Sequence, residues 1–153
     1  MALQSSKDLA EQVLATHLLL SEAIRKGIEV SPVQKKGLFF GLGRDDKQWA
    51  TCALGAAYCG IIKNAQYTDD ENYILAVIQQ TVGVDWDERM ECPAEFADYR
   101  RALMDKSINK WTLRDFNFPC HNKSTLLEWI FWLNDEGDWT REQIADWLQA
   151  NGK

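Results

Sequence analysis

The sequence is poor in the residues from which metal and catalytic sites are most often built, and it has no long apolar run. Its 153 residues include only two histidines and four cysteines. No stretch reaches the roughly 18 apolar residues that a membrane-spanning helix needs. Residues 1–8 also lack the charged, apolar and small-residue regions of a signal peptide. We therefore expect a cytoplasmic protein without a membrane partner, in which the cysteines are reduced thiols.

Positive charge is scarce in the second part of the chain. Residues 67–153 carry nine Lys and Arg against seventeen Asp and Glu, whereas residues 1–66 carry eight against six. Clustered Lys and Arg are what bind a phosphate backbone, so this acidic region makes nucleic acid an unfavourable partner. One modest basic patch, Lys35, Lys36, Arg44 and Lys47, is the exception, and a solvated loop explains it.

What the sequence has in quantity is apolar surface, seven tryptophans included. The apolar fraction of 46% and the charged fraction of 26% are those of an ordinary globular protein. A chain of this length buries roughly 68–70% of its unfolded surface, which is enough for a core without disulfides. Because no linker or repeat divides it, we expect residues 1–153 to form a single domain.

The apolar periodicity predicts a mainly α domain of five or six helices. A first helix is expected over 6–26, where Gly27 supplies the left-handed residue that ends it. Further helices are predicted over 50–60, 68–83, from Pro93 through Leu103, over 124–133 and over 140–148. Two of them begin with a capping-box pattern, Thr68 with Glu71 and Thr140 with Gln143. A minor β-hairpin is expected near residues 28–40.

Two segments resemble their counterparts in a group of small bacterial or phage-type proteins to which no activity is attached. One is Cys52-Ala53-Leu54-Gly55-Ala56-Ala57. The other is Leu133-Asn134-Asp135 followed, after four residues, by Thr140-Arg141-Glu142-Gln143-Ile144-Ala145-Asp146-Trp147-Leu148. The resemblance implies a shared fold and no particular chemistry. Members of the group carry Cys-Pro-x-Cys where this chain has Pro119-Cys120-His121, which argues against carrying over a metal site.

Zinc binding and thiol catalysis are the chemical alternatives that the sequence leaves open, based on Cys52, Cys59 and Cys120. The spacing argues against zinc, because Cys52 and Cys59 lie two helical turns apart, a rise of about 10.5 Å. No Cys-x2-Cys pair is present. The two histidines, His17 and His121, offer no obvious base for a thiol nucleophile. We therefore expect no cofactor, no metal site and no catalytic residue, and favour a protein that is not an enzyme.

The carboxylates gather in two predicted turns, residues 85–91 and 135–138, and the first does not fit a calcium loop. We interpret both as solvated. With catalytic patterns weak, the favoured function is binding of another protein, as an adaptor, inhibitor or accessory factor. Exposed tryptophans would supply the contact surface, and Trp132, Trp139 and Trp147 are the candidates because the last two helices carry more aromatics than a narrow core stripe needs. Self-association into a homo-oligomer is a further alternative.

Overall fold

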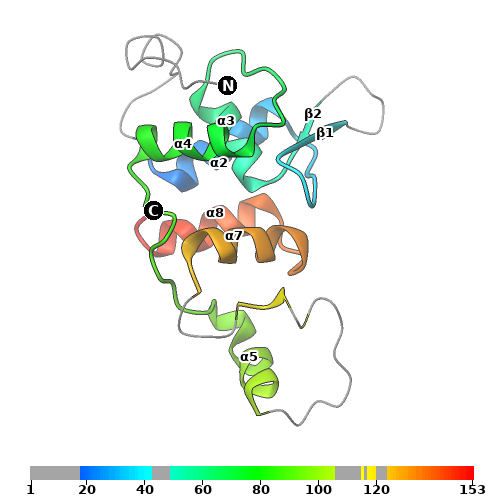
Figure 1. Cartoon of the computed structure of the whole chain (residues 1–153), viewed down its shortest axis with the longest axis vertical. Coiled ribbons are helices and arrows are strands. Elements are labelled where there is room, and N and C mark those ends of the chain that lie inside the picture. The colour runs from blue at the N-terminus through cyan, green and yellow to red at the C-terminus, as the bar shows by residue number, and fades with distance from the viewer. Residues whose placement is uncertain (1–17, 43–48, 106–114, 116, 120–123) are drawn as a thin grey trace. The chain divides into compact units, whose positions relative to one another are not determined.

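The structure is mainly α-helical with one small β-hairpin, which confirms the predicted fold class. It is a computed structural model, and it describes residues 18–42, 49–105, 115, 117–119 and 124–153 (Figure 1). The α-helices of this described part are α2 (Leu20–Val30), α3 (Ala53–Ile61), α4 (Glu71–Val82), α5 (Ala97–Met104), α7 (Leu126–Asp135) and α8 (Arg141–Ala150). A 3₁₀ helix, η1 (Ala94–Phe96), and two strands, β1 (Phe40–Leu42) and β2 (Trp49–Thr51), complete the elements.

The described residues fall into two compact units. The first contains the described residues up to Val84 together with Trp139–Lys153, and the second contains those of Asp85–Asp138. The first unit therefore holds α2, the hairpin, α3, α4 and α8, and the second holds η1, α5 and α7. No helix of the described part is both long and apolar enough to cross a bilayer.

Helices α2 and α3 of the first unit pack at backbone contact through two glycines. A Cβ on Gly27 would lie 1.6 Å from the carbonyl oxygen of Ala56, and one on Gly60 would lie 2.0 Å from that of Ala23. The expectation that Gly27 ends its helix is therefore wrong, because α2 continues to Val30. The glycine is needed at this position because the two helix backbones approach closely, and not because the chain makes a left-handed turn. Every residue of α3 is buried, which explains its run of small and apolar side chains.

The hairpin lies against the start of α3. Strands β1 and β2 pair antiparallel, with Phe40 opposite Thr51 and Leu42 opposite Trp49. The predicted hairpin near 28–40 is thus displaced, since its first strand begins only at Phe40, although Gln34 forms an isolated parallel bridge with Thr51. The sequence could not locate it because two three-residue strands are too short to show alternation. A Cβ on Gly55 would lie 2.0 Å from the carbonyl oxygen of Phe39, so this glycine too permits close packing.

The N-cap of helix α4 lies two residues later than the sequence predicts, and the helix ends at Gly83 as expected. The side chain of Asp70, rather than that of Thr68, caps the helix by accepting a hydrogen bond from the Tyr73 amide at 3.0 Å. Thr68 instead accepts one from the Asp70 amide at 3.1 Å and so positions the cap. Gly83 adopts the predicted left-handed conformation, with φ of 71°.

The core of the second unit is a cluster of aromatic rings around Phe118. Its ring meets those of Trp132, Tyr99 and Trp129 edge to face, with centroids 4.7, 4.8 and 5.4 Å apart. Such edge-to-face pairs contribute about 0.5–1.5 kcal/mol each beyond their buried area. Phe118 itself is only 3% exposed, although it lies in a segment without regular periodicity.

Helix α7 is fixed in this unit by its first turn. Thr125 and Glu128 form a reciprocal capping box, and the Leu126 amide donates to the carbonyl oxygen of Glu88 at 2.7 Å. The indole of Trp129 donates to the carbonyl oxygen of Met90 at 3.1 Å. These bonds attach the irregular segment before η1 to the helix, and they set the direction in which α7 presents its remaining faces.

Candidate functional site: a pocket on helix α7

The three tryptophans proposed from the sequence do not form one exposed surface. Trp132 belongs to the second unit, whereas Trp139 and Trp147 belong to the first. Exposure of Trp132 was expected, and this is wrong, because its side chain is only 3% exposed within the aromatic cluster. Trp139 and Trp147 are half-buried. A binding role for these two stays a prediction.

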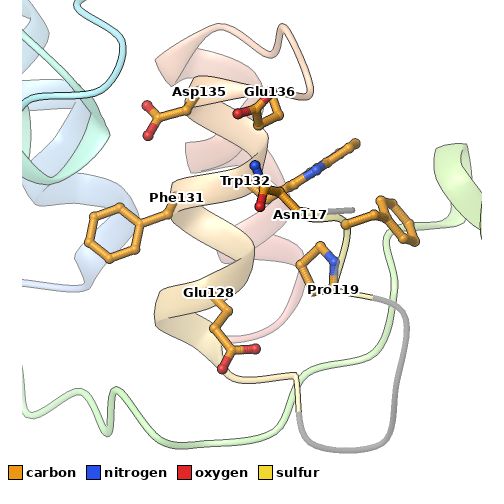
Figure 2. Close-up of a pocket in the computed structure, with 8 residues that line it drawn as sticks. Asn117, Pro119, Glu128, Phe131, Trp132, Asp135 and Glu136 are labelled. Carbon is orange, nitrogen blue, oxygen red and sulfur yellow. The ribbon is translucent and has the colours of Figure 1, made fainter. Parts of the chain in front are cut away.

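Trp132 nevertheless contributes to a pocket of about 440 Å³ in the second unit (Figure 2). Helix α7 provides one wall of it. Figure 2 shows Glu128 near the start of the helix, Asp135 and Glu136 at its other end, and Asn117 and Pro119 beside Trp132. The lining residues are Asn117, Phe118, Pro119, Glu128, Phe131, Trp132, Asp135 and Glu136.

Helical periodicity explains why these side chains of α7 share one side. Residues four positions apart are neighbours on a helix surface, so Glu128, Trp132 and Glu136 follow one another along a single row. Phe131 and Asp135 form the adjacent row at the same spacing. The pocket therefore extends along about two turns of the helix, with an aromatic ring between acidic ends.

The inner part of the pocket is apolar and firmly held. Phe118, Pro119 and Trp132 are all buried, and the rings of Phe118 and Trp132 fix each other in the edge-to-face pair already described. A second ring, Phe96, meets Trp132 with centroids 5.0 Å apart. This floor is preformed, because the rings that build it are also the core of the unit.

The outer part of the pocket carries three carboxyl groups. Glu128 is exposed, and Asp135 and Glu136 are half-buried. Glu128 accepts a hydrogen bond from the Thr125 amide at 3.4 Å, and Asp135 accepts one from the side-chain amide of Asn134 at 2.8 Å. A negative rim suits a cation, because carboxylates attract it directly.

Sequence reasoning missed this site because it assigned the carboxylates to a turn. The helix predicted over 124–133 was expected to end at 133, whereas the corresponding helix α7 continues to Asp135 and has Glu136 as its C-cap. Asp135 is therefore helical and not part of the predicted turn. The signal that could have found the site is the spacing of Glu128, Trp132 and Glu136 at four-residue intervals, once the helix is given its full length.

Two thiols of the described part, those of Cys59 and Cys92, have raised pKa values. Burial raises the pKa of the Cys59 thiol to about 11, although Arg141 nearby lowers it, and burial also raises the pKa of Cys92. A thiol with a raised pKa is a poor nucleophile and a poor metal ligand at neutral pH. Cys52 is buried, and its sulfur accepts a hydrogen bond from the Gly55 amide at 3.4 Å as the N-cap of α3.

No group of three His, Cys, Asp or Glu side chains within the described residues is placed to hold a metal ion. The zinc and thiol alternatives from the sequence also rely on Cys120, His121 and His17. All three lie outside the described residues.

A buried arginine in the first unit serves the fold. Arg141 begins α8 and is 2% exposed. Its guanidinium donates to the carbonyl oxygens of Ser31 and Pro32 at 2.6 and 2.7 Å and to the Thr51 hydroxyl at 2.9 Å. Burial lowers the pKa of Arg141, with Glu142 and the two thiols of α3 opposing that shift. Since these three oxygens belong to α2's end and to β2, Arg141 connects α8 with both.

Comparison with known proteins gives no match to a protein-family model, to a curated protein or to a solved structure. A proposal for function consequently depends on the pocket and on the chemistry of its residues.

Proposed function

We propose that this chain is a protein-binding module that takes up a positively charged segment of another protein in the α7 pocket. The observation that carries the proposal is the combination, in one pocket, of a buried aromatic floor and a rim of three carboxyl groups. Such a module would act as an adaptor, an inhibitor or an accessory factor.

The charge of the second unit supports this choice of partner. Residues 85–138 contain twelve Asp and Glu against seven Lys and Arg. A surface of one sign attracts segments of the opposite sign and raises their rate of association, most strongly at low ionic strength. Lys and Arg also have long apolar stems that can cover an aromatic floor while their charged ends reach the rim.

The shape of the pocket supports a peptide over a small free cation. Glu128 on α7 and Glu136, the C-cap of that helix, are eight residues apart, which corresponds to about 12 Å along the helix axis. A single small cation would contact one end of this span only. A chain segment with several side chains can contact both ends and the aromatic floor together.

A capture experiment with charge-neutralised variants tests the proposal. Wild-type protein, the double variant Glu128→Gln/Glu136→Gln and a control, Glu29→Gln/Glu71→Gln, are used as baits at low salt. The control removes two charges from exposed helix positions of the first unit. We expect the same specific partner with wild type and control, and about a quarter of it or less with the pocket variant.

The bound partner is then tested as overlapping peptides, and the segment that binds is expected to carry net positive charge. Equal capture by the pocket variant, or binding of an acidic segment, would contradict the proposal.

A further inference from the structure

The geometry of the pocket points to an extended partner segment with two basic side chains four residues apart and an apolar side chain midway between them. This inference rests on the proposed function and specifies its partner. It follows from two observations: the spacing of the two rim glutamates and the position of Trp132 between them.

The first observation is the spacing on α7. At about 1.5 Å of rise per residue, Glu128 and Glu136 lie about 12 Å apart along the axis, and Trp132 is about 6 Å from each. Both glutamates line the same pocket as Trp132. A ligand that uses the whole pocket therefore meets negative charge, an aromatic surface and negative charge again at regular steps.

An extended peptide has matching steps. Its side chains alternate between two faces, and it advances about 3.3 Å per residue. Side chains at positions one, three and five consequently share a face and span about 13 Å. With the outer two basic and the middle one apolar, the outer two reach Glu128 and Glu136 while the middle one lies over Trp132 and Pro119.

A helical ligand is the alternative that the test must distinguish. Two of its side chains span about 12 Å only when they are eight residues apart, whereas four residues suffice in an extended peptide. The inner floor is built from mutually packed rings, so enlarging the pocket would disrupt the core of the unit.

The variants must remove charge without disturbing α7, and the sequence offers suitable ones. Glu128 is a rim residue of the pocket. It is also the third residue of α7, whose side chain forms the capping box with Thr125. Glutamine keeps the side-chain acceptor that a capping box requires, so Glu128→Gln removes only the charge. Glu136→Gln is equally conservative, and Glu71→Gln on α4 serves as a matched control outside the second unit.

The test measures binding of fluorescently labelled peptides to the full chain by anisotropy at low salt. The main peptide is Gly-Lys-Ala-Leu-Ala-Lys-Gly. An isomer of the same composition, Gly-Lys-Lys-Ala-Leu-Ala-Gly, places the lysines side by side. A third, alanine-rich helical peptide carries two lysines eight residues apart, which span about 12 Å when helical.

We expect the main peptide to bind about 2–5-fold more tightly than its isomer, which can reach only one rim glutamate, and more tightly than the helical peptide. Glu128→Gln and Glu136→Gln should each weaken its binding by about 2–5-fold, the range of one exposed ion pair, whereas Glu71→Gln should leave it unchanged. Raising the salt concentration should reduce these differences because it screens the rim charges.

The possible failures separate this inference from the proposed function. Equal binding of the two isomers, still weakened by the pocket variants, would overturn the spacing and leave the function standing. Tighter binding of the helical peptide would overturn the extended conformation. If no peptide bound with a dissociation constant below about 1 mM, an interaction of about 4 kcal/mol, both the inference and the pocket's proposed role would fail.

Discussion

At the scale of single residues, glycines and buried polar side chains determine how closely the first unit packs. Gly27 on α2 contacts the backbone of α3, and Gly60 on α3 contacts the backbone of α2. Neither has the positive φ for which glycine is usually required. Periodicity alone could not distinguish these positions from a helix end, because a glycine near the end of a periodic segment is typical of both. Only the position of α3 beside α2 decides which role applies.

Gly27→Ala provides a test in which two effects have opposite signs. Helix propensity alone predicts a gain of about 1 kcal/mol when alanine replaces glycine inside a helix. The new Cβ would lie 1.6 Å from the Ala56 carbonyl oxygen, so we expect a loss of about 2 kcal/mol or more instead. Urea unfolding followed by circular dichroism measures the difference. An unchanged or raised midpoint would show that the two helices are not in backbone contact.

The Cys59 thiol predicts how stability depends on alkaline pH. Its pKa is raised from the usual 9.0 to about 11 in the folded chain, so between these values the unfolded chain loses a proton that the folded chain keeps. The contribution to stability is complete below pH 9 and is lost as the pH rises towards 11, by at most about 1.4 kcal/mol per pH unit.

Comparing unfolding free energies of wild type and Cys59→Ala at several pH values measures this contribution. We expect the decline between pH 9 and 11 to be shallower in the variant, because alanine has no proton to release. Parallel curves for the two proteins would contradict a buried, protonated thiol.

At the scale of elements, the strongly periodic helices could be predicted and their ends could be predicted only in part. Helix α8 and its capping box of Thr140 and Gln143 are as the sequence predicts. The box of Thr125 and Glu128 on α7 and the Asp70 cap of α4 were missed, because several residues at each start can accept the same bond. Which one does so depends on where the preceding chain is held by the rest of its unit.

Arg141 shows how one side chain joins elements that the sequence leaves separate. Arg141→Lys keeps the charge but cannot provide the planar pair of donors that reach Ser31, Pro32 and Thr51. We expect a loss of about 3 kcal/mol, since buried acceptors are left without donors. Arg25→Ala is the comparison, because the bridge of Arg25 to Asp146 is largely exposed and should contribute less than about 1 kcal/mol. Equal effects in denaturant unfolding would argue that the Arg141 bonds do not hold α8.

At the scale of the whole molecule, composition and periodicity were sufficient for the mainly α class with its minor hairpin, but not for the site. The pocket combines α7 with Asn117, Phe118 and Pro119, which have no regular periodicity and reach α7 only through tertiary packing. The three proposed tryptophans illustrate the same limit, since Trp132 is buried and the other two belong to a different unit. Burial of an aromatic residue depends on which neighbours cover it, and the sequence does not state that.

The most direct test of the central claim observes the seven tryptophan indole N–H signals by ¹H–¹⁵N NMR while the peptide Gly-Lys-Ala-Leu-Ala-Lys-Gly is added. The variants Trp132→Phe, Trp139→Phe and Trp147→Phe assign the three signals that matter. Binding in the α7 pocket predicts that the Trp132 signal shifts saturably, and that the shift is lost in Glu128→Gln/Glu136→Gln. Shifts confined to Trp139 or Trp147, with the Trp132 signal unmoved, would contradict the claim and place the binding surface in the first unit.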